Sequence, residues 1–341
     1  MALTESSKIN LDEVSFIRPI LIVLLVLYHA MAIHTGNWEL PTGCEQIPVY
    51  KFVGRLAYSF MLESFVFISG YVYAFQVSIN GARSFWELFI KKFKRLIVPC
   101  WIFGVVYMIL FENAANGIVS SIIQISQGVG HLWFCIMLFI CFMVIWIFIK
   151  VKVPLWIITI ILFTMSLFSF IELPARISLA MYYLLFFFAG YCCWGIRDKI
   201  FAKQSRATVI LKWMLFFICF AVFTYIRSYC AINMPEGITV EICKKICQII
   251  YASFGTMALF STACYITNII KLPQWLITIG KSCFGVYIFQ QFVLKFLYYK
   301  TNFPLLINPF IMPWIAFIVA TAFSLGISSL LRKTEAGRKI I

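Results

Sequence analysis

The segment VSFIRPILIVLLVLYHAMAIH, residues Val14 to His34, is the first of a series of long apolar stretches in this chain. Its 21 residues would form a helix about 30 Å long, which is enough to cross the hydrocarbon core of a bilayer. The run is long for the apolar core of a cleaved signal peptide, and it contains Arg18 and His29. We therefore expect a retained first transmembrane helix here.

Nine further apolar windows follow, each bounded by turn residues or charges. They are Leu56 to Gln76, Phe93 to Phe111, Val129 to Ile149, Val153 to Ile171, Leu179 to Ile196, Val209 to Arg227, Ile246 to Ile270, Trp275 to Tyr298 and Leu305 to Leu331. The 341 residues are 63% hydrophobic and 12% charged, whereas a soluble domain has about 25% charged residues. We predict an all-α, polytopic membrane helix bundle of about ten transmembrane helices, forming one membrane domain over residues 1–341.

The basic residues, which give the chain a formal net charge of +15, lie between the apolar windows and form no single stripe. Alternate loops are rich in lysine and arginine, which predicts that these loops and both termini are cytoplasmic. No nucleic-acid-binding motif accompanies the charge. We therefore expect a lipid bilayer as a partner and no nucleic acid, while the oligomeric state is left open.

The twelve cysteines are scattered and mostly lie inside apolar windows. They have no zinc-binding spacing, so we expect them to be small packing residues and predict no metal site. Cys44 and Cys230 fall in predicted loops on the same side of the membrane, where a disulfide between them is conceivable.

Arg18 and His29 are the two ionisable residues that stand out in the first helix, because a charge in a transmembrane segment is costly and needs an explanation. At about 100° per residue, their spacing of eleven positions places them within roughly 20° of one another and about 16 Å apart along one helix face. One face would thus offer a cation near the cytoplasmic surface and a base deeper in the membrane. The alternatives are a snorkelling arginine and a hydrogen-bonded packing histidine.

Glu63 lies in the second window at a depth similar to that of His29. A buried carboxylate near an imidazole would hold one tautomer and make it more basic, as a general base requires. Glu63 could instead pair with Arg55, two helical turns away.

A basic cluster precedes the third window and contains Lys91, Lys92, Lys94 and Arg95. Topology and attraction to anionic lipids account for most such clusters. The alternative is a phosphate site that holds the nucleotide end of coenzyme A.

Several motifs occur in one order along the chain. They are the Arg18 to His29 spacing, FISGY at residues 67–71, the basic run that ends in Arg95-Leu96-Ile97-Val98-Pro99, HLWF at 131–134, FFFAGY at 186–191 and GKSCFGVY at 280–287. Together they resemble the acyltransferase-3 family, bacterial membrane proteins that acylate O-antigens, capsules, exopolysaccharides, peptidoglycan and antibiotics. The resemblance covers nearly the whole chain.

By position, the resemblance implies that His29 is the essential histidine, that Arg18 is its partner, and that Lys92 and Arg95 replace the family's paired arginines. Three departures are visible. Pro19 follows Arg18, Lys92 replaces an arginine and so loses its bidentate fork, and Gln290 stands where many members have a histidine.

The expected reaction is transfer of an acyl group, by family analogy acetyl, from acyl-CoA to a sugar hydroxyl of a cell-surface or lipid-linked glycan. Acetyl-CoA would be a co-substrate, no permanently bound cofactor is expected, and the location would be the bacterial cytoplasmic (inner) membrane. His29, oriented by Glu63, would either deprotonate the sugar hydroxyl or carry the acyl group itself. The residues expected to line the acceptor side are Tyr28, Ser69, His131, Trp133, Tyr287 and Gln290.

Two other functional classes fit an intramembrane arginine, glutamate and histidine. A transporter or flippase would use them to line a substrate or proton path, but no Gly/Pro-interrupted helices recur in matching halves of the chain. A lipid-linked glycan polymerase would be expected to have a larger outer loop than any found here.

Overall fold

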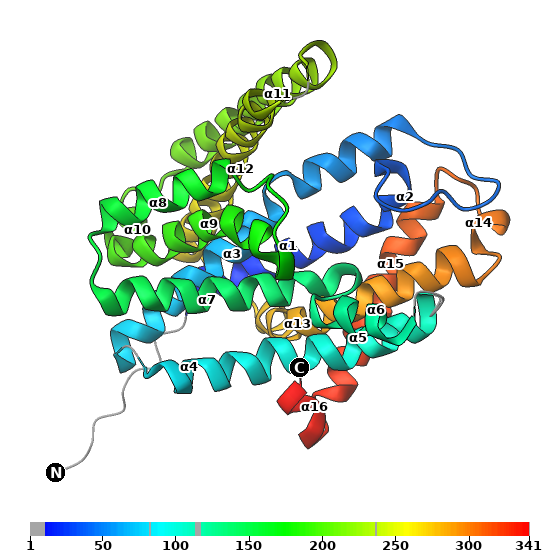
Figure 1. Cartoon of the computed structure of the whole chain (residues 1–341), viewed down its shortest axis with the longest axis horizontal. Helices are drawn as coiled ribbons and strands as arrows, with labels where there is room; N and C mark the ends of the chain where they lie inside the picture. The colour runs from blue at the N-terminus through cyan, green and yellow to red at the C-terminus, as the bar shows by residue number, and fades with distance from the viewer. Residues whose placement is uncertain (1–10, 82, 113–116, 236, 341) are drawn as a thin grey trace.

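The computed structural model describes residues 11–81, 83–112, 117–235 and 237–340, and every regular element within these ranges is helical (Figure 1). The long helices are α1 (Asp12–Ala30), α3 (Pro48–Asn80), α5 (Val98–Phe111), α7 (Trp133–Val151), α8 (Leu155–Leu167), α9 (Ile177–Gly195), α11 (Arg206–Asn233), α12 (Ile238–Ile269), α13 (Gln274–Lys300) and α15 (Met312–Leu331). Short helices connect them: α2 (Ala32–Thr35), α4 (Phe85–Lys92), α6 (Gly117–Ser126), α10 (Arg197–Ala202), α14 (Phe303–Leu306) and α16 (Glu335–Ile340). The predicted all-α membrane bundle is confirmed.

Nine helical segments of the described chain are long and apolar enough to cross a membrane, compared with the ten that the sequence predicts. The difference is the fifth window, in which α8 has only 13 residues and is about 20 Å long. Arg176, just before α9, donates a hydrogen bond to the carbonyl oxygen of Gln127, just before α7, at 3.0 Å. Because α7 and α9 therefore start at the same end of the bundle, α8 and residues 168–176 together must traverse its length.

Side-chain contacts define the two ends of the bundle. At one end, called here the Arg18 end, Glu13 at the start of α1 accepts hydrogen bonds from Arg197 of α10 at 2.9 Å and from Tyr71 of α3 at 2.6 Å. At the opposite end, called the His29 end, Tyr298 of α13 donates to the carbonyl oxygen of Ala30 at 2.6 Å. Helix α1 begins and α15 ends at the Arg18 end.

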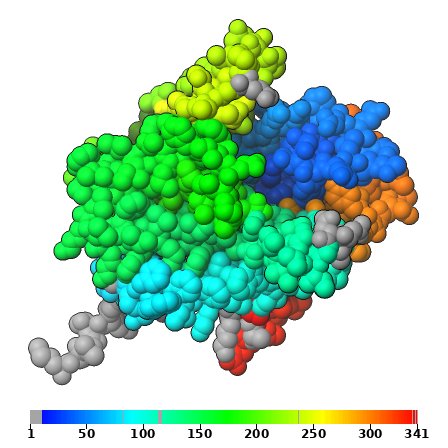
Figure 2. Space-filling model, in the orientation of Figure 1, coloured from blue at the N-terminus to red at the C-terminus, as the bar shows by residue number. Residues whose placement is uncertain are grey.

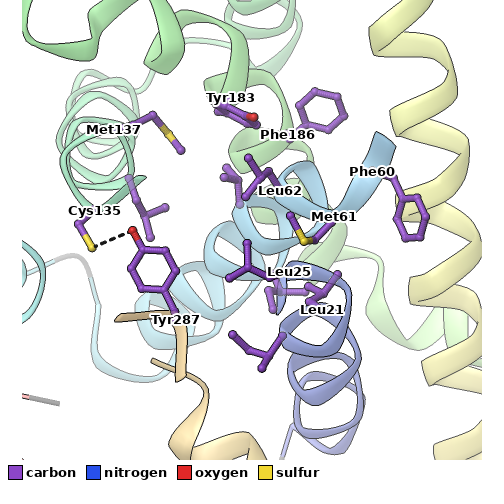
Figure 3. Close-up of a cluster of buried hydrophobic side chains, with 14 of the residues drawn as sticks. Leu21, Leu25, Phe60, Met61, Leu62, Cys135, Met137, Tyr183, Phe186 and Tyr287 are labelled. Carbon is purple, nitrogen blue, oxygen red and sulfur yellow. Dashed lines mark hydrogen bonds between the residues drawn. The ribbon is translucent and has the colours of Figure 1, made fainter. Parts of the chain in front are cut away.

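Helix α1 lies in the centre of the bundle, where it packs against α3, α12, α13 and α15 (Figure 1). Ile17, Leu21 and Leu25 recur at the spacing of one helix face and are buried. Figure 3 shows Leu21 and Leu25 facing Met61 and Leu62 of α3. This central position fixes the direction in which the polar side chains of α1 point.

Helices α3 and α9 approach each other closely because glycines meet at their interface. A Cβ atom on Gly70 would lie 1.9 Å from the carbonyl oxygen of Phe187, and one on Gly190 would lie 1.9 Å from that of Phe67. Any other residue at these positions would push the helices apart, which is the usual role of small residues between membrane helices.

The hairpin of α11 and α12 projects from one side of the bundle (Figure 1). Large apolar side chains of α11, such as Leu211, Phe217 and Ile218, are exposed, as expected of a surface that faces lipid.

All cysteines in the described ranges are free. The disulfide considered between Cys44 and Cys230 is absent, since Cys230 instead lies 3.7 Å from Cys243, sulfur to sulfur, on the neighbouring helix.

Candidate active site

A cavity of about 380 Å³ opens at the Arg18 end, and we call it the cationic cavity. Five of its lining residues are basic: Arg18, Lys92, Arg95, Lys281 and Arg332. None of the described residues that line it is acidic. The rest of the lining is mostly apolar and comes from α1, α3, α7 and α13. Five positive charges without a carboxylate make this a candidate site for an anionic molecule with an apolar part.

Lys92 is the most buried of these cations. Its side chain is 6% exposed, its ammonium lies 3.4 Å from the ring centre of Phe142, and it is absent from the ion pairs of the described chain. A buried cation without a counter-ion is costly, which points to an external anion. Lys91 and Lys94, which the sequence grouped with it, are exposed and lie outside the cavity lining.

The local backbone helps to explain this placement. Residues Phe93–Ile97 form a π-helical turn between α4 and α5. Pro99 has no N–H group and cannot donate to the carbonyl of Arg95, so the regular α-helical bond is lost at that point. Single π-turns of this kind are frequent at functional sites.

A second cavity, also of about 380 Å³, contains His29 and is called the histidine cavity. It is lined by Leu25, Tyr28, His29, Ala32, Asn37, Trp38, Tyr58, Leu62, Tyr107, Glu112, Gly130, His131, Trp133, Phe134, Tyr287, Gln291 and Lys295. Figure 2 shows the surface hollowed where the blue first helices meet the green middle of the chain. The ring of Trp38 stacks on that of His29 with 5.8 Å between centres.

His131 faces His29 across this cavity, with 6.4 Å between ring centres. Its Nε2 lies 2.9 Å from the carbonyl oxygen of Ile288, and its Nδ1 lies 2.8 Å from Oε1 of Gln291. Tyr287 donates its hydroxyl to the carbonyl oxygen of His131 at 2.6 Å. His131 is therefore fixed on both ring nitrogens, whereas His29 forms no such pair of hydrogen bonds.

Four side chains line both cavities: Leu25, Leu62, Phe134 and Tyr287. They form a thin partition between the cationic cavity and the histidine cavity. Figure 3 shows Tyr287 reaching from α13 toward α7, where its hydroxyl meets the thiol of Cys135 at 3.8 Å. Arg18 and His29 thus lie on opposite sides of a partition that α1 itself helps to build.

Besides Lys91 and Lys94, three sequence-based placements differ from the structure. Glu63 does not meet His29 and lines neither cavity, because its carboxylate accepts a hydrogen bond from Tyr182 at 2.9 Å. Ser69 lines the cationic cavity and not the acceptor side. Gln290 lines neither cavity, whereas its neighbour Gln291 lines the histidine cavity.

The other expected residues divide between the two cavities as the sequence predicted. Tyr28, His131, Trp133 and Tyr287 line the histidine cavity with His29, while Lys92 and Arg95 line the cationic cavity with Arg18.

Sequence reasoning missed further lining residues. The sequence assigned no site role to Arg332 or to Lys281 of the 280–287 motif. In the structure, the guanidinium of Arg332 donates to the carbonyl oxygen of Lys281 at the cationic cavity. Lys295 lies within the ninth apolar window, where its charge is a signal that could have found it. Trp38 and Gln291 carry no signal that distinguishes them from packing residues.

A comparison with protein families gives one match, to the acyltransferase domain, over residues 11–333. The chain belongs to this acyltransferase family. The match covers all the motifs and both cavities, and it confirms the resemblance seen in the sequence. Comparisons with curated proteins and with solved structures gave no match. The protein is thus a membrane-embedded acyltransferase, and its two cavities are the candidate sites for the two substrates.

Proposed function

We propose that this acyltransferase moves an acyl group from acyl-CoA, bound in the cationic cavity, to a sugar hydroxyl bound in the histidine cavity. The observation that carries the proposal is the shared partition of Leu25, Leu62, Phe134 and Tyr287. Two sites with different chemistry meet at this layer, so two substrates entering from opposite ends would meet there as well.

The cationic cavity suits coenzyme A because the nucleotide end of that molecule carries several phosphate charges while its pantetheine arm is long and thin. Arg18, Lys92 and Arg95 would bind the phosphates with Lys281 and Arg332. The apolar part of the lining would receive the arm, with the thioester directed to the partition. Because acyl-CoA is made in the cytoplasm, the Arg18 end would face the cytoplasm.

The histidine cavity suits a sugar because its wall contains both aromatic rings and polar groups. Tyr28, Trp38 and Trp133 offer flat surfaces for the C–H faces of a sugar ring. Asn37, together with Glu112 and Lys295, would pair with its hydroxyl groups.

His29 would act as the general base. Its imidazole takes the proton of the sugar hydroxyl as the oxygen attacks the thioester carbonyl. The tetrahedral intermediate then collapses, the carbon–sulfur bond breaks, and the CoA thiolate leaves and takes up the proton. The products are the O-acyl sugar and CoA–SH. Transient acylation of His29 itself is the alternative route.

We further propose acetyl as the acyl group, a cell-surface or lipid-linked glycan as acceptor, and the bacterial inner membrane as the location. These choices rest on the family alone. Membership of an acyltransferase family favours this reaction over the transporter and the polymerase that the sequence left open.

The test uses purified protein in lipid nanodiscs, radiolabelled acetyl-CoA and a glycolipid extract. We expect labelled acetyl to appear on glycan, and we expect His29→Ala and Arg18→Ala proteins at matched levels to lose this activity. Ser324→Ala is the matched control, because Ser324 is buried on α15 but lines neither cavity. Full activity of His29→Ala, or no acyl product with any donor, would refute the proposal.

A further inference from the structure

Three polar atoms without partners lie together behind the histidine cavity. They are Nδ1 of His29 and both amide atoms of Gln290, all buried and without a hydrogen bond among the described residues. Each such atom costs about 1–3 kcal/mol when left unsatisfied. Gln291, the next residue of α13, contacts His131, whose ring centre lies 6.4 Å from that of His29. The Gln290 side chain is a neighbour of the His29 ring but forms no hydrogen bond with it. A small side-chain adjustment would therefore satisfy two of the three atoms at once.

The orientation of the His29 ring gives this contact a consequence. His29 lines the histidine cavity, whereas Gln290 is 0% exposed and lies behind it. Nδ1 is the buried nitrogen, which leaves Nε2 as the nitrogen available to the cavity. The backbone carbonyl of Leu25, one turn earlier on α1, also lies against the ring and can only accept a hydrogen bond. The groups behind the ring thus favour a proton on Nδ1.

We propose that Gln290 is the positioning residue of His29, its Oε1 accepting a hydrogen bond from Nδ1–H so that the Nε2 lone pair faces the histidine cavity. This is the role that the sequence assigned to Glu63, which the structure places on Tyr182 instead. A neutral amide holds the tautomer without placing a charge in the membrane. The catalytic consequence rests on the proposed function, but the tautomer itself does not.

Histidine tautomers can be measured directly, because the chain has only three histidines, His29, His34 and His131. His34 accepts a hydrogen bond at Nδ1 from the backbone N–H of Ile47 at 3.3 Å, so its proton is on Nε2. His131 has an oxygen acceptor at each ring nitrogen, the carbonyl of Ile288 at Nε2 and Oε1 of Gln291 at Nδ1, so either tautomer forms a hydrogen bond. The signal of His29 is therefore identified as the one that His29→Ala removes.

The experiment is solid-state NMR of the full protein labelled with ¹⁵N-histidine in lipid bilayers. We expect the signal that His29→Ala removes to be an Nδ1–H tautomer in the wild type, and to become a mixture or the Nε2–H form in Gln290→Leu. Ser324→Ala, which also removes a buried unpartnered polar atom, should leave the spectrum unchanged. An unchanged His29 tautomer in Gln290→Leu, or an Nε2–H tautomer of His29 in the wild type, overturns the proposal.

Steady-state kinetics of acyl transfer provide a second test. Gln290→Leu should lower kcat about 10- to 100-fold, as loss of a group that orients a reactive histidine does, with KM for both substrates within about twofold. Gln290→Glu, which keeps the acceptor oxygen, should recover most of the lost kcat. An effect on KM alone, or no recovery with glutamate, contradicts a positioning role. If no protein transfers acyl groups, the proposed reaction fails while the NMR result still decides the tautomer.

Discussion

Replacement of Lys92 by methionine is the sharpest test of the donor site. Lys92 is 6% exposed and has no carboxylate partner in the described part of the chain, so the substitution breaks no internal ion pair. Methionine keeps the length of the side chain and a favourable contact with the ring of Phe142. We therefore expect the variant to fold and to retain its thermal stability without ligand.

The expected loss is in donor binding. A hydrogen bond between an ammonium and a phosphate contributes about 1.5–3 kcal/mol. At 1.36 kcal/mol per tenfold change, this corresponds to a rise of about 10- to 150-fold in the Kd for acetyl-CoA. Because Lys92 is far from the acceptor in the proposed arrangement, KM for the glycan should change by less than about twofold.

The assay is titration of acetyl-CoA, and of adenosine 3′,5′-bisphosphate as a probe for the phosphate end, into protein in nanodiscs. Lys91→Met and Lys94→Met are the matched controls, because both side chains are exposed outside the cavity. They should keep the wild-type Kd at physiological salt. If the three variants lose affinity equally, the basic cluster acts only as a diffuse surface charge and the cationic cavity is not the donor site.

Three further perturbations test the fold and the partition. Gly70→Ala should destabilise the protein by more than about 2 kcal/mol in thermal unfolding, because the added Cβ meets a carbonyl oxygen of α9 at 1.9 Å, whereas Gly195→Ala, with nothing within 4 Å, should be tolerated. Mild oxidation should join Cys230 to Cys243 and protect both from alkylation, as peptide mass spectrometry would show; continued alkylation would contradict their contact. Phe134→Ala opens the partition, so we expect hydrolysis of acetyl-CoA without acceptor to increase relative to transfer; an unchanged ratio would argue against a shared wall.

The helical architecture could be predicted from the sequence, because a helix that crosses the hydrocarbon core must be long and apolar. Nine of the ten apolar windows are membrane-length helices. The exception is the fifth window, where α8 has only 13 residues and residues 168–176 complete the crossing. The spacing of Arg18 and His29 is likewise a property of one helix. Such features depend on local periodicity and can be read without knowing the packing.

Side-chain contacts between two helices were harder to predict from the sequence. Glu63 and His29 occur at similar depth, but depth does not specify which way a side chain points around its helix axis. The structure turns Glu63 toward Tyr182 of α9, away from α1. Gln290 and Gln291 are adjacent in sequence, yet only Gln291 reaches a cavity. A rotation of 100° about the helix axis separates these outcomes, and hydropathy does not detect it.

The partition also separates two electrostatic requirements that oppose each other. In the proposed reaction, binding of the CoA phosphates would require several cations, whereas proton transfer to His29 would require that no excess positive charge lies near it. All five cations of the cationic cavity lie beyond Leu25 and Leu62. Lys295, the cation in the histidine cavity, has Glu112 at 3.8 Å. Because the charges are divided in this way, the neutral Gln290 that we propose behind His29 would be sufficient to orient it, and a carboxylate would not be needed there.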